Sequence, residues 1–82
     1  IKIKNIMKYT NYKHILMRYT QTKGFSLPVY TINKEDGPNH NKCFSIQVII
    51  DNNVVGEGLA KSKKQAEQKA AFSAIQCIGI DM

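Results

Sequence analysis

The stretch that decides the fold runs from Cys43 to Ala71 and reads CFSIQVIIDNNVVGEGLAKSKKQAEQKAA. Apolar side chains alternate along residues 43–50, which is typical of a strand that buries one face. Residues 51–53, Asp-Asn-Asn, tolerate positive φ and predict a hairpin turn. The next strand carries Gly56 and Gly58 two positions apart, so one of its faces is bare. The pattern therefore predicts an antiparallel hairpin with a bare face on its second strand.

A helix follows the hairpin and begins at Ser62. Ser62 and Gln65 form an S-x-x-Q capping box, which satisfies backbone N–H groups at the helix start. One broad face of this helix consists mostly of small residues, namely Ala66, Ala70, Ala71, Ala74, Ile75 and Ile78. Small residues let a helix lie close to its neighbour, and Gly79 then ends the helix.

A second amphipathic helix is predicted within residues 9–22. Its apolar stripe has the spacing i, i+3, i+4, i+7 and consists of Tyr12, Ile15, Leu16 and Tyr19. Asn11 is the predicted N-cap and Gly24 the predicted stop. Residues 29–32 then predict a strand, and residues 33–42 predict a polar loop centred on a Gly-Pro turn.

These elements predict one α+β domain with the order α-β-β-β-α, in which two helices pack against a three-stranded antiparallel sheet. We assign residues 9–79 to the domain and residues 80–82 to a tail. Residues 1–8 are expected to be a linker from a preceding domain that is absent from this chain. The first residue is Ile1, which favours a piece of a longer protein.

The charge indicates a polyanion partner. Twelve Lys and Arg residues stand against six Asp and Glu, which gives a net charge of +6. All of the basic residues except Arg18 are Lys, which binds phosphates as a point charge and seldom reads base edges. A basic surface that serves only solubility is the alternative.

Other function classes find little support in the composition. No apolar run approaches the roughly 18 residues of a membrane span, so no membrane partner is expected. Cys43 and Cys77 form no CxxC pair, and we expect free thiols in an intracellular, reducing compartment such as the cytoplasm. His40 and Cys43 have a loose metal-ligand spacing without a second pair, so no metal site is expected.

The start of the last helix is the most informative charge cluster. Lys61, Lys63 and Lys64 flank or enter the first turn, where the helix dipole favours acids instead. This arrangement makes sense if an anion binds there, because backbone N–H groups, dipole and ammonium groups then act together. A solvated basic helix start is the alternative.

A family resemblance rests on five motifs. They are Leu27-Pro28-x-Tyr30, Gly37-Pro38-Asn39-His40, Phe44-x-Ile46-x-Val48, Gly56-x-Gly58 and Ser62-Lys63-Lys64-x-Ala66-Glu67-x-x-Ala70-Ala71. With these motifs in this order, residues 12–78 resemble the double-stranded-RNA-binding domain. The SKKxAEQ motif, with Asn11-Tyr12-Lys13 upstream, most resembles the C-terminal domain of ribonuclease III. In many other members of the family the Glu67 position is Lys.

The resemblance implies an RNA-binding site in three parts. The first helix and the Gly-Pro loop would enter two successive minor grooves, and the lysines would hold phosphates across the major groove between them. Such a module reads the shape of a duplex of roughly 16 base pairs. The implied RNA-binding residues are His14, Arg18 and Gln21; Gly37, Pro38, Asn39, His40 and Lys42; and Lys61, Ser62, Lys63 and Lys64.

Two features depart from the ribonuclease III pattern, the pair Met17-Arg18 and the single residue Phe72. Met17 and Arg18 stand where those domains usually carry a Gln-Glu pair, so Arg18 would contact phosphate and Gln21 would reach the groove. Phe72 points away from the alanine face, and we expect it to be exposed or covered by the tail. A domain of the same fold that contacts proteins or dimerises, through Met17, Ile49 or Phe72, is the alternative function.

Catalysis is not expected of this chain. Its acids, Glu35, Asp36, Asp51, Glu57, Glu67 and Asp81, are scattered over loops and strand ends, whereas ribonuclease III chemistry needs clustered carboxylates around divalent metal. The resemblance therefore implies a double-strand-specific endoribonuclease as the parent protein. Its catalytic domain and metal would lie outside this chain, and a homodimer would form through the parent protein. No cofactor is expected here.

Overall fold

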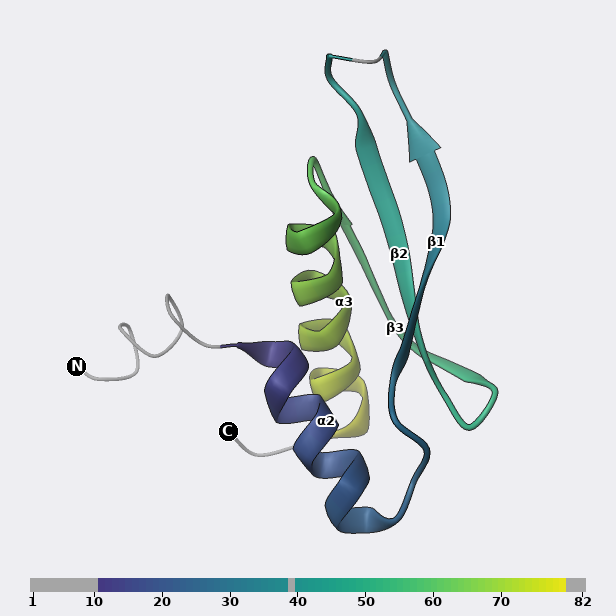
Figure 1. Cartoon of the computed structure of the whole chain (residues 1–82), viewed down its shortest axis with the longest axis vertical. Helices are drawn as coiled ribbons and strands as arrows, with labels where there is room; N and C mark the ends of the chain where they lie inside the picture. The colour runs from purple at the N-terminus through teal and green to yellow at the C-terminus, as the bar shows by residue number, and fades with distance from the viewer. Residues whose placement is uncertain (1–10, 39, 80–82) are drawn as a thin grey trace, which may run out of the picture.

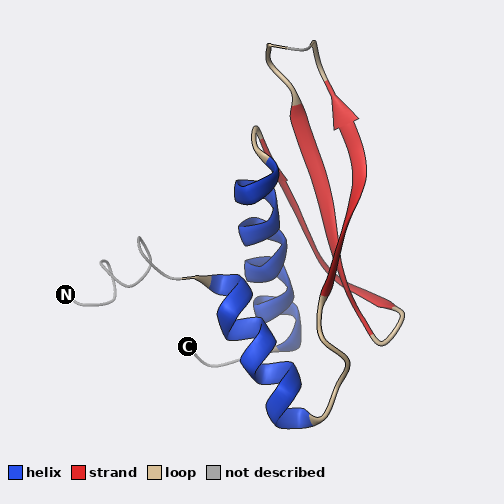
Figure 2. Cartoon of the chain, in the orientation of Figure 1, coloured by secondary structure: helices blue, strands red, loops and turns tan. Residues whose placement is uncertain are grey.

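Two helices and a three-stranded antiparallel sheet form two layers in the computed structural model, which describes residues 11–38 and 40–79 (Figures 1 and 2). The elements are α2 (Tyr12–Lys23), β1 (Val29–Asp36), β2 (Cys43–Ile50), β3 (Asn53–Ala60) and α3 (Lys63–Ile78). The strand order is β1-β2-β3. This architecture confirms the predicted α-β-β-β-α order. The predicted linker and tail, residues 1–8 and 80–82, lie outside the described residues.

The β2–β3 hairpin closes through a tight turn. Asp51 and Asn52 both adopt positive φ, at 50° and 67°, which matches the right-handed twist of the two strands. The turn is one residue shorter than the sequence predicts, because Asn53 already pairs with Ile50. The register then shifts at Val55, which has no partner on β2 and packs against the edge of the core.

The bare face of β3 lies directly against α3. A Cβ atom on Gly58 would overlap the carbonyl oxygen of Ala66, and one on Gly56 would lie 2.6 Å from the backbone nitrogen of Ala74. Backbone therefore rests on backbone, which only glycine opposite alanine permits. This contact confirms the prediction of a bare strand face, and it sets the distance between α3 and the sheet.

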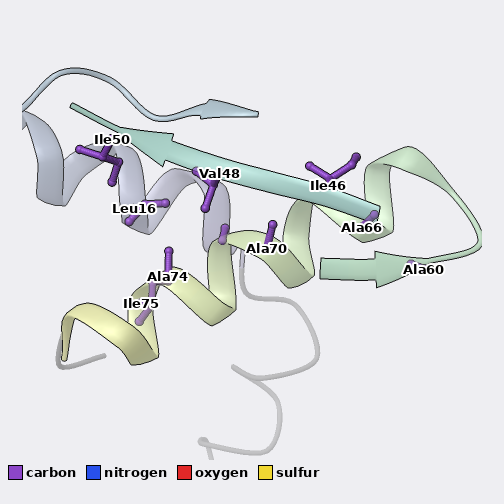
Figure 3. Close-up of a cluster of buried hydrophobic side chains, with 10 residues drawn as sticks. Leu16, Ile46, Val48, Ile50, Ala60, Ala66, Ala70, Ala74 and Ile75 are labelled. Atoms are coloured by element: carbon purple, nitrogen blue, oxygen red, sulfur yellow. The ribbon is translucent and has the colours of Figure 1, made fainter. Parts of the chain in front are cut away.

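The core lies between the sheet and the helices (Figure 3). Its buried apolar residues are Leu16, Ile46, Val48, Ile50, Ala60, Ala66, Ala70, Ala71, Ala74 and Ile75. Tyr12 and Ile15 pack against this cluster as predicted, whereas Tyr19 is half-buried and lies beside Phe25. Thr20, which was not predicted to lie in the core, is fully buried and donates its hydroxyl proton to the carbonyl oxygen of Met17 at 2.8 Å.

Two local predictions were wrong. The strand β1 continues to Asp36, although residues 33–42 were predicted as a loop. The register shifts near residue 33, and Lys34 to Asp36 then pair with residues 43–45 through the backbone while their side chains stay exposed. Phe72 is not exposed but half-buried, and the ring of Tyr12 lies against it with 4.8 Å between centroids; the alternative, cover by the tail, falls on residues outside the described ones.

Candidate nucleic-acid interface

The start of α3 presents lysines around a capped helix end. Ser62 is extended, at φ −131° and ψ 152°, and its Oγ accepts the N–H of Gln65 at 3.1 Å. The first turn contains no acid, and Lys61, Lys63 and Lys64 are all exposed. Helix dipole and ammonium groups therefore create one positive surface, as an anion site requires.

The lysines of this cluster are not equivalent. The ammonium nitrogen of Lys63 lies 5.7 Å from the ring centroid of Phe44 on β2, which is within the range of a cation–π contact. This contact holds the side chain against the sheet. We therefore expect Lys63 to be the most ordered of the three lysines before any ligand binds.

The β1–β2 loop is stiffened by its backbone. Gly37 has φ 97°, and a Cβ atom there would lie 2.5 Å from the carbonyl oxygen of Asn41. The N–H of Asn41 donates to the carbonyl oxygen of Pro38 at 2.9 Å. His40 is exposed, and Lys42 is half-buried with its Nζ 3.4 Å from Glu35. Asn39, a predicted RNA contact, lies outside the described residues.

The outer face of α2 carries the third group of predicted residues. His14, Arg18 and Gln21 are exposed and share one side of the helix, opposite Leu16 and Thr20. Beside this face runs an open groove of about 310 Å³. It is lined by Asn11, Lys13, His14, Met17, Leu27, Pro28 and Tyr30.

The fold brings the three groups together in a row. In Figure 1 the start of α3 lies between the β1–β2 loop, at the top of the view, and α2, below it. This order is the one that a minor–major–minor groove contact needs, since the lysines occupy the middle position. The segments that carry the predicted residues therefore follow one another in this view in the order β1–β2 loop, start of α3 and α2.

A junction between α2, α3 and β1 was not anticipated from the sequence. Lys13 and Glu67 form an ion pair with 2.5 Å between Nζ and Oε1, and the same Nζ lies 4.9 Å from the ring centroid of Tyr30. Burial, and secondarily the charge of Glu67, raises the pKa of Tyr30 to about 12. Glu67 lies 54 residues from Lys13 along the chain, so no local pattern in the sequence indicated this contact.

The acids do not form a metal site among residues 11–38 and 40–79. No group of three or more His, Cys, Asp or Glu side chains is close enough there to hold a metal ion. Three of the carboxylates pair with lysines instead, since Glu35, Asp36 and Glu67 contact Lys42, Lys34 and Lys13. Within the same residues, neither helix is long and apolar enough to cross a membrane.

Comparisons with known proteins agree with this geometry. The family model described as "Double-stranded RNA binding motif" matches residues 12–77. The chain is 47% identical over 66 residues to Ribonuclease 3 of Natranaerobius thermophilus, covering 80% of this chain and 29% of that protein. It is 41% identical over 71 residues to Ribonuclease 3 of Syntrophobacter fumaroxidans, covering 87% and 29%. The chain thus spans less than a third of these relatives.

A solved structure extends the likeness to the fold. The structure titled "Structure of Arabidopsis HYL1 and its molecular implications for miRNA processing" superposes with a TM-score of 0.74 at 33% identity. The match covers 83% of this chain and 96% of that one. The arrangement of helices and strands is therefore shared along almost the whole of that chain.

Proposed function

Because the chain belongs to the double-stranded RNA binding motif family, we propose that it is the substrate-binding arm of a ribonuclease III-type enzyme. The observation that carries the proposal is the exposed lysine cluster around the capped, acid-free start of α3. A rigid turn and a polar helix face flank this cluster. The arm would recognise the shape of duplex RNA and make no base-specific contact.

Each part of the surface has its own task in this proposal. Lys61, Lys63 and Lys64 would hold phosphates across the major groove, with Ser62 ordering the helix start between them. The outer face of α2 and the β1–β2 loop would each enter a minor groove and meet 2′-hydroxyl groups. Since the lysines are point charges, they support affinity and leave selection of RNA to the two groove contacts.

The proposal extends to the parent protein. The relatives named Ribonuclease 3 are more than three times as long as the matched region, so catalysis and its divalent metal would belong to another domain. A homodimer would then form through that domain. Cys43 and Cys77 are free thiols, which supports a reducing, cytoplasmic setting.

The first experiment compares ligands. The chain is titrated with a 20-base-pair RNA duplex, the DNA duplex of the same sequence and each single strand, all at matched salt. We expect the RNA duplex to bind most tightly, because A-form grooves and 2′-hydroxyls are the signal. Equal affinity for the RNA and DNA duplexes would overturn the proposal.

The second experiment tests the lysine cluster. Lys63→Ala and Lys64→Ala should each weaken binding to every duplex sequence alike, and each should lower the salt slope by about one unit. Lys23→Ala is the matched control, because it removes one charge at the far end of α2. A salt slope that is unchanged in the Lys63, Lys64 double variant would show that the cluster is only solvated.

The third experiment tests the outer face of α2. Arg18→Ala should weaken binding and reduce its salt dependence if Arg18 contacts phosphate. The double change Met17→Gln, Arg18→Glu should raise the preference for RNA over DNA, because polar partners for 2′-hydroxyls return while a positive charge is lost. If neither variant moves the RNA-to-DNA ratio, α2 is not part of the reading surface.

A further inference from the structure

The helix α2 buries fewer side chains than α3 does. Only Leu16 and Thr20 of this helix are fully buried, and its outer face supplies one of the three RNA-facing groups. Tyr12 and Ile15 pack half-buried beside them, and apolar contacts of this kind have little directionality. The direction of α2 therefore depends on the polar contacts at its start.

The first of these contacts joins three elements through Lys13. Its ammonium nitrogen lies between the carboxylate of Glu67 on α3 and the ring of Tyr30 on β1, at 2.5 Å from Oε1 and 4.9 Å from the ring centroid. The Lys13 and Glu67 side chains are only 38% and 29% exposed. Partial burial strengthens both contacts relative to a surface ion pair.

The second contact runs through Gln68. Its Oε1 accepts the backbone N–H of Tyr12 at 2.8 Å, and its Nε2 donates to Oδ1 of Asn11 at 2.9 Å. The same Asn11 oxygen caps α2 by accepting the N–H of His14 at 3.2 Å. One side chain of α3 thus bonds both the cap and the first residue of α2, which fixes the direction in which that helix leaves the junction.

Glu67 occupies a position that is unfavourable for RNA binding by charge alone. It lies one turn beyond Lys63 and Lys64 on α3, where a carboxylate repels phosphates that those lysines would hold. Its bond to Lys13 offsets the repulsion and ties α2 to the helix that carries the lysine cluster.

We propose that Lys13, Glu67 and Gln68 are positioning residues that set the direction of the α2 outer face relative to the α3 lysines. This inference rests on the proposed function and adds to it the residues that hold two of the three RNA contacts in register. These residues act on RNA recognition through α2 and need not touch RNA themselves.

The direction in which Glu67→Ala changes the affinity for RNA tests the inference. Glu67→Ala makes the domain more positive, so a purely electrostatic role predicts tighter binding to a 20-base-pair RNA duplex. Positioning predicts binding about two- to fivefold weaker, the range that a partly exposed ion pair supports. Glu57→Ala is the matched control, because it removes the same charge from the exposed face of β3 and should leave binding equal or slightly tighter.

Variants of Lys13 and Gln68 complete the test. Lys13→Ala changes charge in the opposite sense to Glu67→Ala yet should also weaken binding, and the double variant should bind no worse than the weaker single variant. Lys13→Arg keeps both contacts and should bind like the parent chain. Gln68→Ala leaves the charge unchanged and should weaken binding about twofold, in line with the loss of a modest hydrogen bond.

The RNA-to-DNA ratio separates positioning from a loss of stability. At a temperature where circular dichroism shows all variants folded, positioning predicts a lower ratio in Glu67→Ala and a salt slope like that of the parent chain. A variant that merely unfolds more easily keeps the parent ratio, and that result would overturn the inference.

The parent chain and Lys64→Ala are measured alongside. If the parent chain does not prefer RNA to DNA, the proposed function falls and the inference falls with it. If the parent prefers RNA and Lys64→Ala weakens it, but Glu67→Ala binds as tightly as the parent or more tightly, only the inference is overturned.

Discussion

The two helices are attached to the domain in different ways. The helix α3 lies on β3 through alanines that face Gly56 and Gly58, so its distance from the sheet is set by atomic size. The helix α2 fully buries only one leucine and one threonine, with Tyr12 and Ile15 half-buried against the core, and polar side chains also bond its first turn. Close packing resists any change of volume, whereas hydrogen bonds fix direction. The lysines thus stand on the closely packed helix, and α2 depends on directional contacts.

The largest effect is expected from Gly58→Ala. The added methyl group would overlap the backbone of α3 at Ala66 and Ala70, which cannot move without lifting the helix. We expect a loss of about 3 kcal/mol in the free energy of unfolding, measured by urea denaturation. The neighbouring Leu59 is 58% exposed, and Leu59→Ala should cost less than about 1 kcal/mol. Equal losses at both positions would refute the close contact.

The two N-caps sharpen the comparison. Ser62 Oγ accepts one N–H, whereas Asn11 Oδ1 accepts both the N–H of His14 and the amide of Gln68. Ser62→Ala should therefore cost about 1 kcal/mol and Asn11→Ala about 2 kcal/mol of unfolding free energy. A larger loss for Ser62→Ala would mean that the second bond of Asn11 contributes nothing.

Local opening of the helices provides a third test. By native-state hydrogen exchange, amides of α2 should open at a lower free energy than those of α3, since α2 has fewer buried contacts. Gln68→Ala should lower the opening free energy of α2 by about 1 kcal/mol and leave the second half of α3 unchanged. Uniform loss of protection in both helices would show that they open as one unit.

The smallest effect is expected at Tyr30. Its hydroxyl is buried, and no hydrogen-bond partner for it lies among the residues that the structure describes. Tyr30→Phe should therefore change stability at pH 7 by less than about 0.5 kcal/mol. The difference between the two proteins should grow at high pH.

The direction of the pH effect follows from the raised pKa. The phenol has a pKa of about 12 in the folded chain against 10.0 unperturbed, so between these values the unfolded chain releases the proton and the folded chain keeps it. Its contribution to stability is complete below pH 10 and falls as pH rises toward 12. The parent is compared with Tyr30→Phe, which differs from it only in this phenol and should lose less stability over this range.

Local patterns predicted most of the fold. Alternation in residues 43–50, the glycine pair of β3 and the alanine face of α3 act over a few residues, and each appears in the structure as predicted. The last residues of β1 were not predicted as strand. Lys34 to Asp36 pair through the backbone on an exposed edge, where the side-chain pattern carries no information.

In the candidate site, too, local features were predicted and contacts between distant residues were missed. The lysine cluster was predicted because a basic first turn conflicts with the helix dipole, which is a local signal. The partners of Lys13 and Asn11 lie 54 and 57 residues away along the chain, and one sequence gives no means to pair them. The contact of Lys42 with Glu35 was missed for a related reason, because the strand that carries Glu35 was read as loop.

The Asp51–Asn52 turn has a practical use. It closes one end of the eight-residue strand β2 and the β1–β2 loop closes the other, so about 23 Å of extended chain separate them (Figure 1). A fluorophore or a surface tether attached at the turn would leave the lysine cluster and the loop uncovered. Both turn residues already have positive φ, so Asn52→Gly would relieve backbone strain when such a label is attached.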